Sequence, residues 1–229
     1  MKLTKKDLNN VIDRYTKRFL EFGHDPKSLG WDKGKQFLRY HILIENLNLE
    51  NSTILDLGCG FGDANYLLKQ IVSDYIYLGI DIVPVLINEA NKVWEEDLKI
   101  NFINDDFLSF DFSDNFDYVI SSGMFNFKLN DIDNYIFIEN TLKKAFKIAK
   151  KAVSFDFLSN NVDYEYKHTF HSNPSKILEI AYSLTKRVRL RNDYMPFEFS
   201  ITLFKDDTFD SSDTIFKNYK IENPFVKIS

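Results

Sequence analysis

Three glycines at alternate positions stand where a short apolar run gives way to a polar one. The segment 54–63 reads Ile-Leu-Asp-Leu-Gly-Cys-Gly-Phe-Gly-Asp. Glycine lets the backbone turn sharply and come close to a ligand, because it has no Cβ. The apolar run predicts a strand over 53–57, and the residues after the loop predict a helix over 63–72. The first N–H groups of such a helix are free to bind a ligand, so the segment indicates a nucleotide-type site.

Two other nucleotide-binding loops fit this segment poorly. The NAD-type fingerprint needs glycine at its first, third and sixth positions, and counting from Gly58 the sixth position is Asp63. Asp56, two residues before the first glycine, would face a pyrophosphate badly but suits a ligand with a positive ammonium or sulfonium group. A P-loop requires Gly-Lys followed by Ser or Thr, which the segment lacks.

Acidic residues come directly after the next two predicted strands. The strand predicted over 75–80 leads to Asp81, roughly 20 residues past the glycines, where a carboxylate commonly accepts hydrogen bonds from ribose hydroxyls. The strand predicted over 100–103 leads to Asp105 and Asp106. Taken alone, these two acids are better explained by loop capping, but the set together with the glycine loop indicates a nucleoside ligand.

This arrangement resembles the class I S-adenosylmethionine methyltransferases over about residues 50–205. The resemblance implies that the glycine loop cradles the methionine part, that Asp81 holds the ribose, and that Asp106 reads adenine while Phe107 stacks on it or supplies an N–H. Asp105 is the rival for the adenine role. The residues assigned to the cofactor in this way are Asp56, Gly58, Cys59, Gly60, Gly62, Asp81, Ile82, Asp105, Asp106, Phe107 and Ser121.

Two residues before the glycine loop extend the proposed cofactor site. Trp31 and Arg39 would cover the cofactor from the N-terminal side, with Arg39 pairing with the methionine carboxylate. The alternative is an arginine on a helix surface and a tryptophan that only packs.

A finer resemblance rests on three further segments. They are Gly30-Trp31 with Gln36 and Arg39, the run 121–126, and the run 193–199. The set is similar to a bacterial group of small-molecule methyltransferases often found with surface-polysaccharide genes. That group often has Asn near the start of the fifth strand, where this chain has Asp156.

The residues directly after the fourth strand narrow the choice of acceptor. Enzymes that methylate amino groups of nucleic-acid bases carry a Pro-Pro motif there, and metal-assisted catechol-type enzymes carry a carboxylate for Mg²⁺. This chain has Ser121-Ser122-Gly123-Met124, and it lacks the paired glutamates of protein arginine methyltransferases. We therefore expect a small-molecule acceptor, no metal and no nucleic-acid partner.

Several polar residues after the fourth and fifth strands are candidates for catalysis and acceptor binding. His168 and His171 are the preferred general bases because histidine titrates near neutral pH. Asp156, Tyr164 and Tyr166 are further candidates for the base, and the histidines have the alternative of surface or helix-capping roles. Residues expected to bind the acceptor are Asn126, Tyr164, Arg191 and Tyr194.

Arg191 belongs to a run of alternating arginines. Arg187, Arg189 and Arg191 share one face of a predicted strand. The run is most simply explained as a solvated sheet edge, although Arg191 would lie near the cleft and suits a phosphate or carboxylate.

The elements that must position these residues alternate between strand and helix from residue 53. Such alternation predicts an α/β fold with a doubly wound, mostly parallel seven-stranded sheet and helices on both faces. The last two strands are joined by only three residues, which predicts an antiparallel strand near the edge. We expect an N-terminal helical cap over 1–50, a Rossmann-like domain over 51–205 and an extension over 206–229. The remaining predicted helices are 4–22, 33–48, 85–97, 132–149 and 174–184, and the remaining strands are 116–121, 152–158, 186–193 and 197–205.

Composition adds broad limits. The chain has 229 residues and a net charge of −5. Its single cysteine cannot form an internal disulfide, which fits a reducing compartment. No stretch approaches the roughly 18 apolar residues of a membrane span, so we expect a cytoplasmic protein. The composition says nothing of the oligomeric state. Two other functions stay open: an aminopropyl-type transferase on the same fold, and a non-catalytic cofactor-binding partner subunit.

Overall fold

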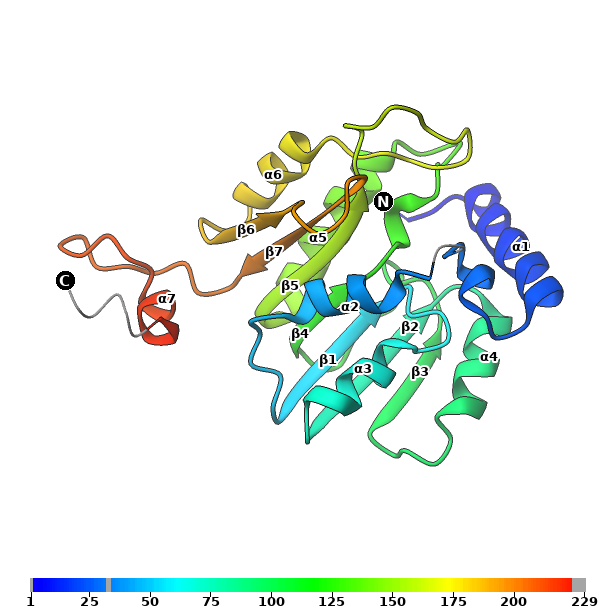
Figure 1. Cartoon of the computed structure of the whole chain (residues 1–229), viewed down its shortest axis with the longest axis horizontal. Coiled ribbons are helices and arrows are strands. Elements are labelled where there is room, and N and C mark those ends of the chain that lie inside the picture. Colours follow the sequence, from blue (N-terminus) through cyan, green and yellow to red (C-terminus); the bar gives the residue numbers. More distant parts are fainter. Residues whose placement is uncertain (1, 32–33, 224–229) are drawn as a thin grey trace.

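A seven-stranded sheet forms the centre of the molecule (Figure 1). The structure is a computed structural model that describes residues 2–31 and 34–223. The strand order is β3-β2-β1-β4-β5-β7-β6, and β7 runs antiparallel to both of its neighbours. The strands are β1 (Ser52–Leu57), β2 (Tyr75–Asp81), β3 (Ile100–Asn104), β4 (Phe116–Ser121), β5 (Ala149–Leu158), β6 (Val188–Arg191) and β7 (Glu198–Phe204). The predicted fold class and the reversed strand are confirmed.

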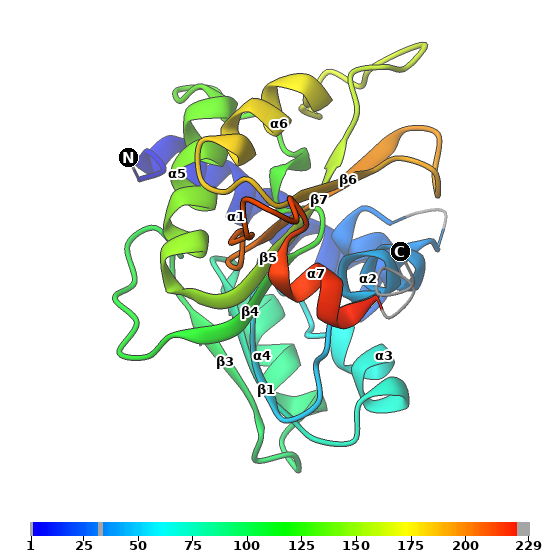
Figure 2. The same ribbon diagram turned by 90° about the vertical axis from the view of Figure 1, so that its left-hand side faces the viewer.

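Helices cover both faces of this sheet (Figure 2). One face packs against α2 (Gln36–Ile44), α3 (Ala64–Ile71) and the end of α4 (Pro84–Val93) through Leu43, Leu68 and Trp94. The other face packs against α5 (Asn134–Ile148) and α6 (Pro174–Tyr182). Side chains that alternate along β1 supply both cores, since Ile54 faces the first and Leu55 the second.

The N-terminal helix lies against the carboxyl end of the sheet. Helix α1 (Lys5–Phe22) begins at Thr4, whose side chain accepts a hydrogen bond from the Asp7 N–H. Its apolar stripe packs with the short helix η1 (Pro26–Leu29) onto the start of α4. This helix therefore covers the end of the sheet at which the predicted site residues lie.

The register of the sheet brings the predicted acids together at the carboxyl ends of the strands. Leu57 on β1 pairs with Ile80 on β2, and Asp81 pairs with Asn104 on β3. The glycine loop, Asp81 and the residues after Asn104 therefore leave the sheet side by side. This is the carboxyl end of a parallel sheet, where ligands of open α/β folds bind.

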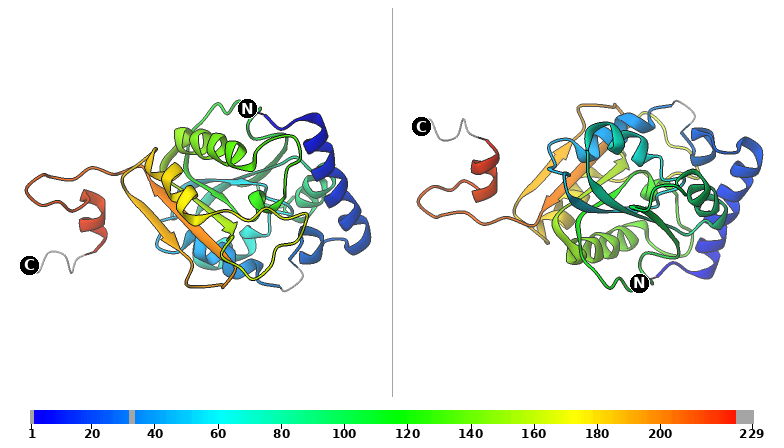
Figure 3. Two further views of the ribbon diagram at one scale, coloured as in Figure 1. Left: turned by 90° about the horizontal axis from the view of Figure 1, so that it is seen from above. Right: turned by 90° about the horizontal axis from the view of Figure 1, so that it is seen from below.

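The segment after β7 departs from the body, at the opposite end of the molecule from α1 (Figure 3). It forms a turn and a short helix, α7 (Lys217–Glu222), which the sequence did not predict. Glu222 pairs with Arg187. Arg187 is buried, so the prediction that the arginine run forms a solvated sheet edge is wrong for this residue. Arg189 is half-buried and stacks near Phe204, so the arginine run packs against other parts of the chain. Residues 224–229 of the predicted extension lie outside the described residues.

Most predicted boundaries agree with the structure within a few residues. The helix predicted over 33–48 is shorter, because α2 ends at Ile44 before the turn at 45–46. The helix predicted over 85–97 ends at Val93, after which Trp94 turns inward. Of the helices in the described residues, none is long and apolar enough to cross a bilayer.

Candidate functional site

The glycine loop turns sharply against its neighbours. Gly60 has a φ of +55°, in the left-handed region that favours glycine, and a Cβ there would lie 3.1 Å from the Leu29 side chain. Gly62 has a φ of +73°, and a Cβ there would lie 2.5 Å from the Phe102 ring. The loop therefore requires glycine at both positions, for its backbone conformation and for its packing.

Asp81 points at this loop. One carboxylate oxygen accepts a hydrogen bond from the Gly60 N–H at 3.0 Å, and the other accepts one from the Val83 N–H at 2.8 Å. Burial raises the pKa of Asp81, and these backbone donors oppose that rise. A carboxylate oxygen can accept more than one hydrogen bond, so both remain able to accept from hydroxyl groups of a ligand.

A first cavity of about 970 Å³, its open mouth included, lies over the glycine loop. Of the residues assigned to the cofactor, it is lined by Trp31, Gly58, Cys59, Gly60, Asp81, Ile82, Asp105, Asp106 and Phe107.

The two acids after β3 differ in their surroundings. The Asp106 carboxylate is tied into its own turn, where it accepts hydrogen bonds from the Leu108 N–H and the Ser109 hydroxyl. Asp105 is more exposed and accepts from the Asp106 N–H at 2.7 Å. Phe107 is buried behind them. Both acids line the first cavity.

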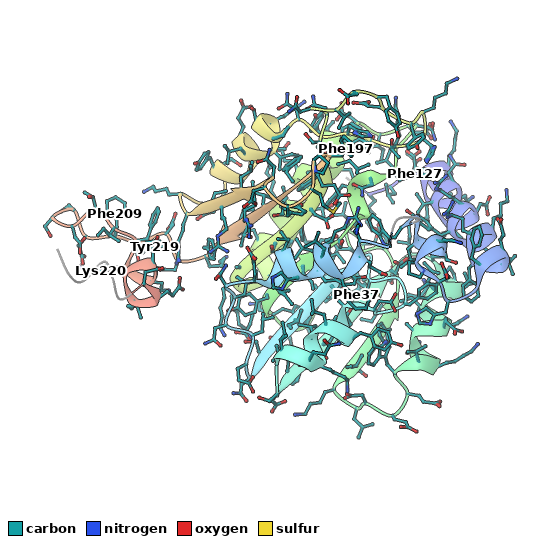
Figure 4. All side chains as sticks on the ribbon, viewed as in Figure 1. Phe37, Phe127, Phe197, Phe209, Tyr219 and Lys220 are labelled. Atoms are coloured by element: carbon teal, nitrogen blue, oxygen red, sulfur yellow. The ribbon has the colours of Figure 1, made fainter. Side chains whose placement is uncertain are left out.

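A second cavity, of about 1800 Å³ with its open mouth included, adjoins the first. Lining residues that the two cavities share are Tyr15, Leu29, Trp31, Gly123 and Phe127. Phe127 and Phe197 lie on its walls, at the upper end of the sheet in Figure 4. Of the residues predicted to bind or activate the acceptor, it is lined by Asn126, Tyr164, Tyr166, His168 and His171.

The two histidines on this cavity are held differently. His171 Nδ1 lies 2.7 Å from the Ser159 carbonyl oxygen, to which it must donate, and Nε2 lies 3.1 Å from the Thr169 hydroxyl. The His168 ring stacks beside Tyr166, and within the described part of the chain the ring makes no hydrogen bond. Burial, aided by nearby Arg14 and Arg18, lowers the pKa of His168. A general base requires a neutral imidazole with a free nitrogen, and His168 provides one.

The prediction that Arg39 pairs with the methionine carboxylate is wrong, because its guanidinium already has a partner. Arg39 is 8% exposed, and its guanidinium forms a two-pronged ion pair with Glu198, which is 4% exposed. It also lies under the Trp31 ring, 4.0 Å from the ring centroid. Arg39 lines the second cavity and not the first, so its role is to support the Trp31 wall between them.

Asp156 is not a general base in this structure. It is 2% exposed and lies outside the linings of both cavities. Its oxygens accept hydrogen bonds from the Ser122 hydroxyl at 2.6 Å and the Gly123 N–H at 2.7 Å. Burial, with the nearby Glu198 charge, raises the pKa of Asp156 to about 7. Asp156 therefore fixes the loop after β4, and Gly123 of that loop lines both cavities.

Three residues assigned to the cofactor lie behind the cavity rather than in its lining. Asp56 accepts a hydrogen bond from the Tyr77 hydroxyl at 2.7 Å, and burial raises the pKa of Asp56 to about 7. Ser121 donates to the Leu57 carbonyl at 2.8 Å, and Gly62 packs against Phe102. These three support the loop, and this geometry gives Asp56 no direct contact with a cationic ligand.

Two residues predicted to bind the acceptor also lie elsewhere. Arg191 pairs with Glu45 and Asp193 on the outer strand and lines neither cavity. Tyr194 is half-buried and its hydroxyl lies near Asp156 and Glu198, behind the second cavity. The carboxyl end of β6 lies farther from the cleft than the sequence suggested, because β7 is inserted between β5 and β6.

The contribution of α1 to both cavities was not predicted from the sequence. Val11 and Tyr15 line the first cavity, and Arg14, Tyr15 and Arg18 line the second. The helical spacing of Val11 and Tyr15 marks an apolar face but does not say what that face covers. Among the residues that the structure describes, no group of three or more His, Cys, Asp or Glu side chains is placed to hold a metal ion.

Comparisons with known proteins agree with this geometry. Residues 54–152 match a family described as "Methyltransferase domain". The chain is 27% identical over 158 residues to a Mycobacterium tuberculosis protein with the provisional name methyltransferase Rv1506c, covering 67% of this chain and 93% of the relative.

Solved structures share the fold. Magnesium protoporphyrin IX methyltransferase of Synechocystis PCC 6803, solved with bound S-adenosylmethionine, aligns with a TM-score of 0.63 at 15% identity, covering 89% of this chain and 99% of that one. The pyocyanin biosynthetic protein PhzM aligns with a TM-score of 0.63 at 14% identity, covering 83% and 61%. At such identities the likeness is one of fold. The segment 54–152 is therefore similar to a methyltransferase domain, and the chain has the fold of the class I enzymes.

Proposed function

We propose that this protein transfers the methyl group of S-adenosylmethionine to an oxygen or nitrogen of a small polar acceptor. The observation that carries this proposal is the pair of adjoining cavities. The first lies over the glycine loop and Asp81, and the second carries His168 and Asn126. A donor in one cavity and an acceptor in the other would meet at Trp31 and Gly123, which line both.

The first cavity fits the proposed cofactor. Asp81 has oxygens to accept from ribose hydroxyls, and the backbone of Gly58 and Gly60 comes close to the cavity where a Cβ would crowd its neighbours. The cofactor supplies a methyl group on a positively charged sulfur. The protein has to align the acceptor atom with that methyl group and keep water out, which is the main requirement of an in-line displacement.

His168 is the proposed general base for an oxygen acceptor. Its ring faces the second cavity without a competing hydrogen bond from the described residues, whereas both nitrogens of the His171 ring already have neighbours. The lowered pKa keeps the His168 imidazole neutral near pH 7, ready to take a proton from a hydroxyl.

The finer identity of the acceptor extends the same proposal. The likeness to enzymes linked to surface polysaccharides favours a sugar-related or phosphorylated compound. Methyltransferase assays with sugar nucleotides and sugar phosphates would test this proposal directly. The functions of the neighbouring genes would guide the choice of compounds.

Isothermal titration with S-adenosylmethionine and S-adenosylhomocysteine tests the cofactor site. We expect micromolar binding of both, and release of S-adenosylhomocysteine only when an acceptor is present. Absence of binding to the folded protein would contradict the proposal. Equal or better binding of the decarboxylated cofactor would favour an aminopropyl transferase, and turnover only with an added partner chain would favour a cofactor-binding subunit.

A further inference from the structure

We infer that the acceptor carries an anionic group, a phosphate or a carboxylate, and that Arg14 on α1 binds this group with help from Arg18 and Lys35. The inference rests on the proposed function, because it treats the second cavity as the acceptor site. It moves the anion site from the outer strand, where Arg191 is already paired, to the N-terminal helix.

The positions of the two arginines on α1 carry the first step. Arg14 and Arg18 are four residues apart and therefore lie on one side of the helix. Both line the second cavity and neither lines the first. Both side chains are half-buried, and the Arg18 guanidinium also donates to the Lys27 carbonyl, so Arg14 is the main contact for an anion.

The charge balance of the cavity carries the second step. Among residues 2–31 and 34–223, no carboxylate forms an ion pair with Arg14, which interacts with the Tyr15 hydroxyl. Of the acidic residues on this cavity within 2–31 and 34–223, Glu198 is engaged by Arg39, and Asp163 is the remaining one. Arg14 and Lys35 outnumber it even when Arg18 is left out of the balance. The second cavity therefore has an excess of positive charge on a protein whose net charge is −5.

The position of His168 carries the third step. Arg14 and Arg18 are close enough to contribute to the lowered pKa of the His168 ring, which lies on the loop facing α1 across the cavity. The backbone of that loop is fixed, since the Lys128 N–H donates to the His168 carbonyl at 3.0 Å. An anion on Arg14 would thus place the rest of the acceptor between the proposed base and Trp31. The guanidinium fork suits a phosphate or a carboxylate in a defined orientation.

Nuclear magnetic resonance of the histidine rings provides the test. The chain has four histidines, so ¹⁵N-labelled rings give few signals, and His168→Gln assigns the one of interest. Inorganic phosphate and, separately, acetate are titrated at constant pH and ionic strength. We expect one or both anions to shift the His168 signals in a saturable way, and the stronger of the two identifies the anionic group.

Arg14→Gln is the test variant and Lys17→Gln the matched control. Lys17 is exposed on the same helix and lines neither cavity. Loss of a charged hydrogen bond predicts roughly tenfold weaker anion binding for Arg14→Gln and no change for Lys17→Gln. Equal binding by the wild type and Arg14→Gln, or a His168 signal that neither anion shifts, would overturn the inference.

Titration with S-adenosylmethionine separates this inference from the proposed function. One outcome is that the cofactor binds both variants as it binds the wild type while neither anion shifts the His168 signals. In that case the inferred anion site is wrong and the methyltransferase proposal stands. If Arg14→Gln weakens cofactor binding and phosphate competes with the cofactor, Arg14 instead binds the methionine carboxylate, which also overturns the inference. If the wild type does not bind the cofactor, the proposed function itself fails.

Discussion

The carboxylate of Asp81 accepts a hydrogen bond of 3.0 Å from the backbone N–H of Gly60. One carboxylate thus connects the end of β2 to the middle of the glycine loop. Because the same side chain lines the first cavity, it holds the loop in place and offers oxygens to the ligand. The second role makes a prediction for the affinity of the cofactor.

Asp81→Asn should weaken S-adenosylhomocysteine binding by roughly tenfold or more, since hydrogen bonds to a charged group are worth about 1.5–3 kcal/mol. The sharper measurement uses the 2′-deoxy analogue of S-adenosylhomocysteine in isothermal titration. The wild type should distinguish the two ligands, and Asp81→Ala should distinguish them much less. If removal of the 2′-hydroxyl weakens ligand binding by the same factor in both proteins, Asp81 does not bind the ribose.

Gly123→Ala should displace the wall between the two cavities. Gly123 has a φ of +76°, and a Cβ there would lie 2.5 Å from the Trp31 ring. Overpacking of this kind costs about 1–3 kcal/mol in addition to the backbone strain of the left-handed region. We expect a lower melting temperature, altered tryptophan fluorescence and a raised KM for the acceptor.

Gly23→Ala is the matched control for that variant. Gly23 has a φ of +64°, and a Cβ there would meet nothing within 4 Å. It therefore carries the strain of a positive φ, here with a ψ of −146° rather than −1°, without the clash. Equal effects of the two substitutions on fluorescence and KM would show that contact with Trp31 is not the cause.

The sequence was sufficient to predict the sheet, because its strands are apolar runs separated by helical patterns. The short connection before β7 was likewise enough to predict the reversed strand. The sequence could not say which carboxylates face the cavity. Asp56 and Asp81 both end or nearly end a strand, but the hydroxyl of Tyr77, which pairs in the sheet with Ile54, donates to the Asp56 carboxylate and holds it behind the first cavity.

The remaining misassignments have the same origin in long-range contacts. Arg39 is engaged by Glu198, which lies 159 residues later in the chain, and no local pattern announces that pair. Arg191 stands at the carboxyl end of its predicted strand and was therefore expected near the cleft, but β7 lies between β5 and β6 and moves it outward. The helix or strand to which a residue belongs was predictable from the spacing of apolar residues. Side-chain pairs between elements far apart in the sequence could be found only from the fold.

The pair Arg39 and Glu198 gives a third prediction. Arg39→Met leaves a buried carboxylate without its partner, which typically costs about 3–5 kcal/mol of unfolding free energy. The double variant Arg39→Met with Glu198→Leu should recover most of that loss in urea denaturation, because both charges are then absent. Trp31 loses its cation in either variant, so both should bind the acceptor more weakly. A double variant as unstable as the single one would mean that the pair itself stabilises the fold.

His24 gives a pH-dependent prediction. Its Nε2 lies 2.9 Å from Asp63, at the start of α3, and this hydrogen bond raises the pKa of His24. A raised pKa in the folded state means that the folded protein binds the proton more tightly than the unfolded chain does. The stabilisation is therefore fully present below the unfolded pKa of about 6.5 and is lost as the pH rises through the folded value. The pair connects the loop after α1 to the glycine loop region, so its loss should loosen the N-terminal cover.

The measurement is the difference in unfolding free energy between the wild type and His24→Gln at several pH values from 5.5 to 9, which are chosen to bracket the ordinary histidine pKa. We expect the wild type to be more stable by on the order of 1 kcal/mol at the acidic end, as for a partly exposed ion pair, and the difference to shrink toward alkaline pH. His41→Gln is the control, because His41 is exposed and lies 3.7 Å from Glu45 on its own helix turn. A His24 difference that stays constant with pH would show that packing of the ring on Phe61, 4.2 Å between centroids, rather than the charge, connects the two segments.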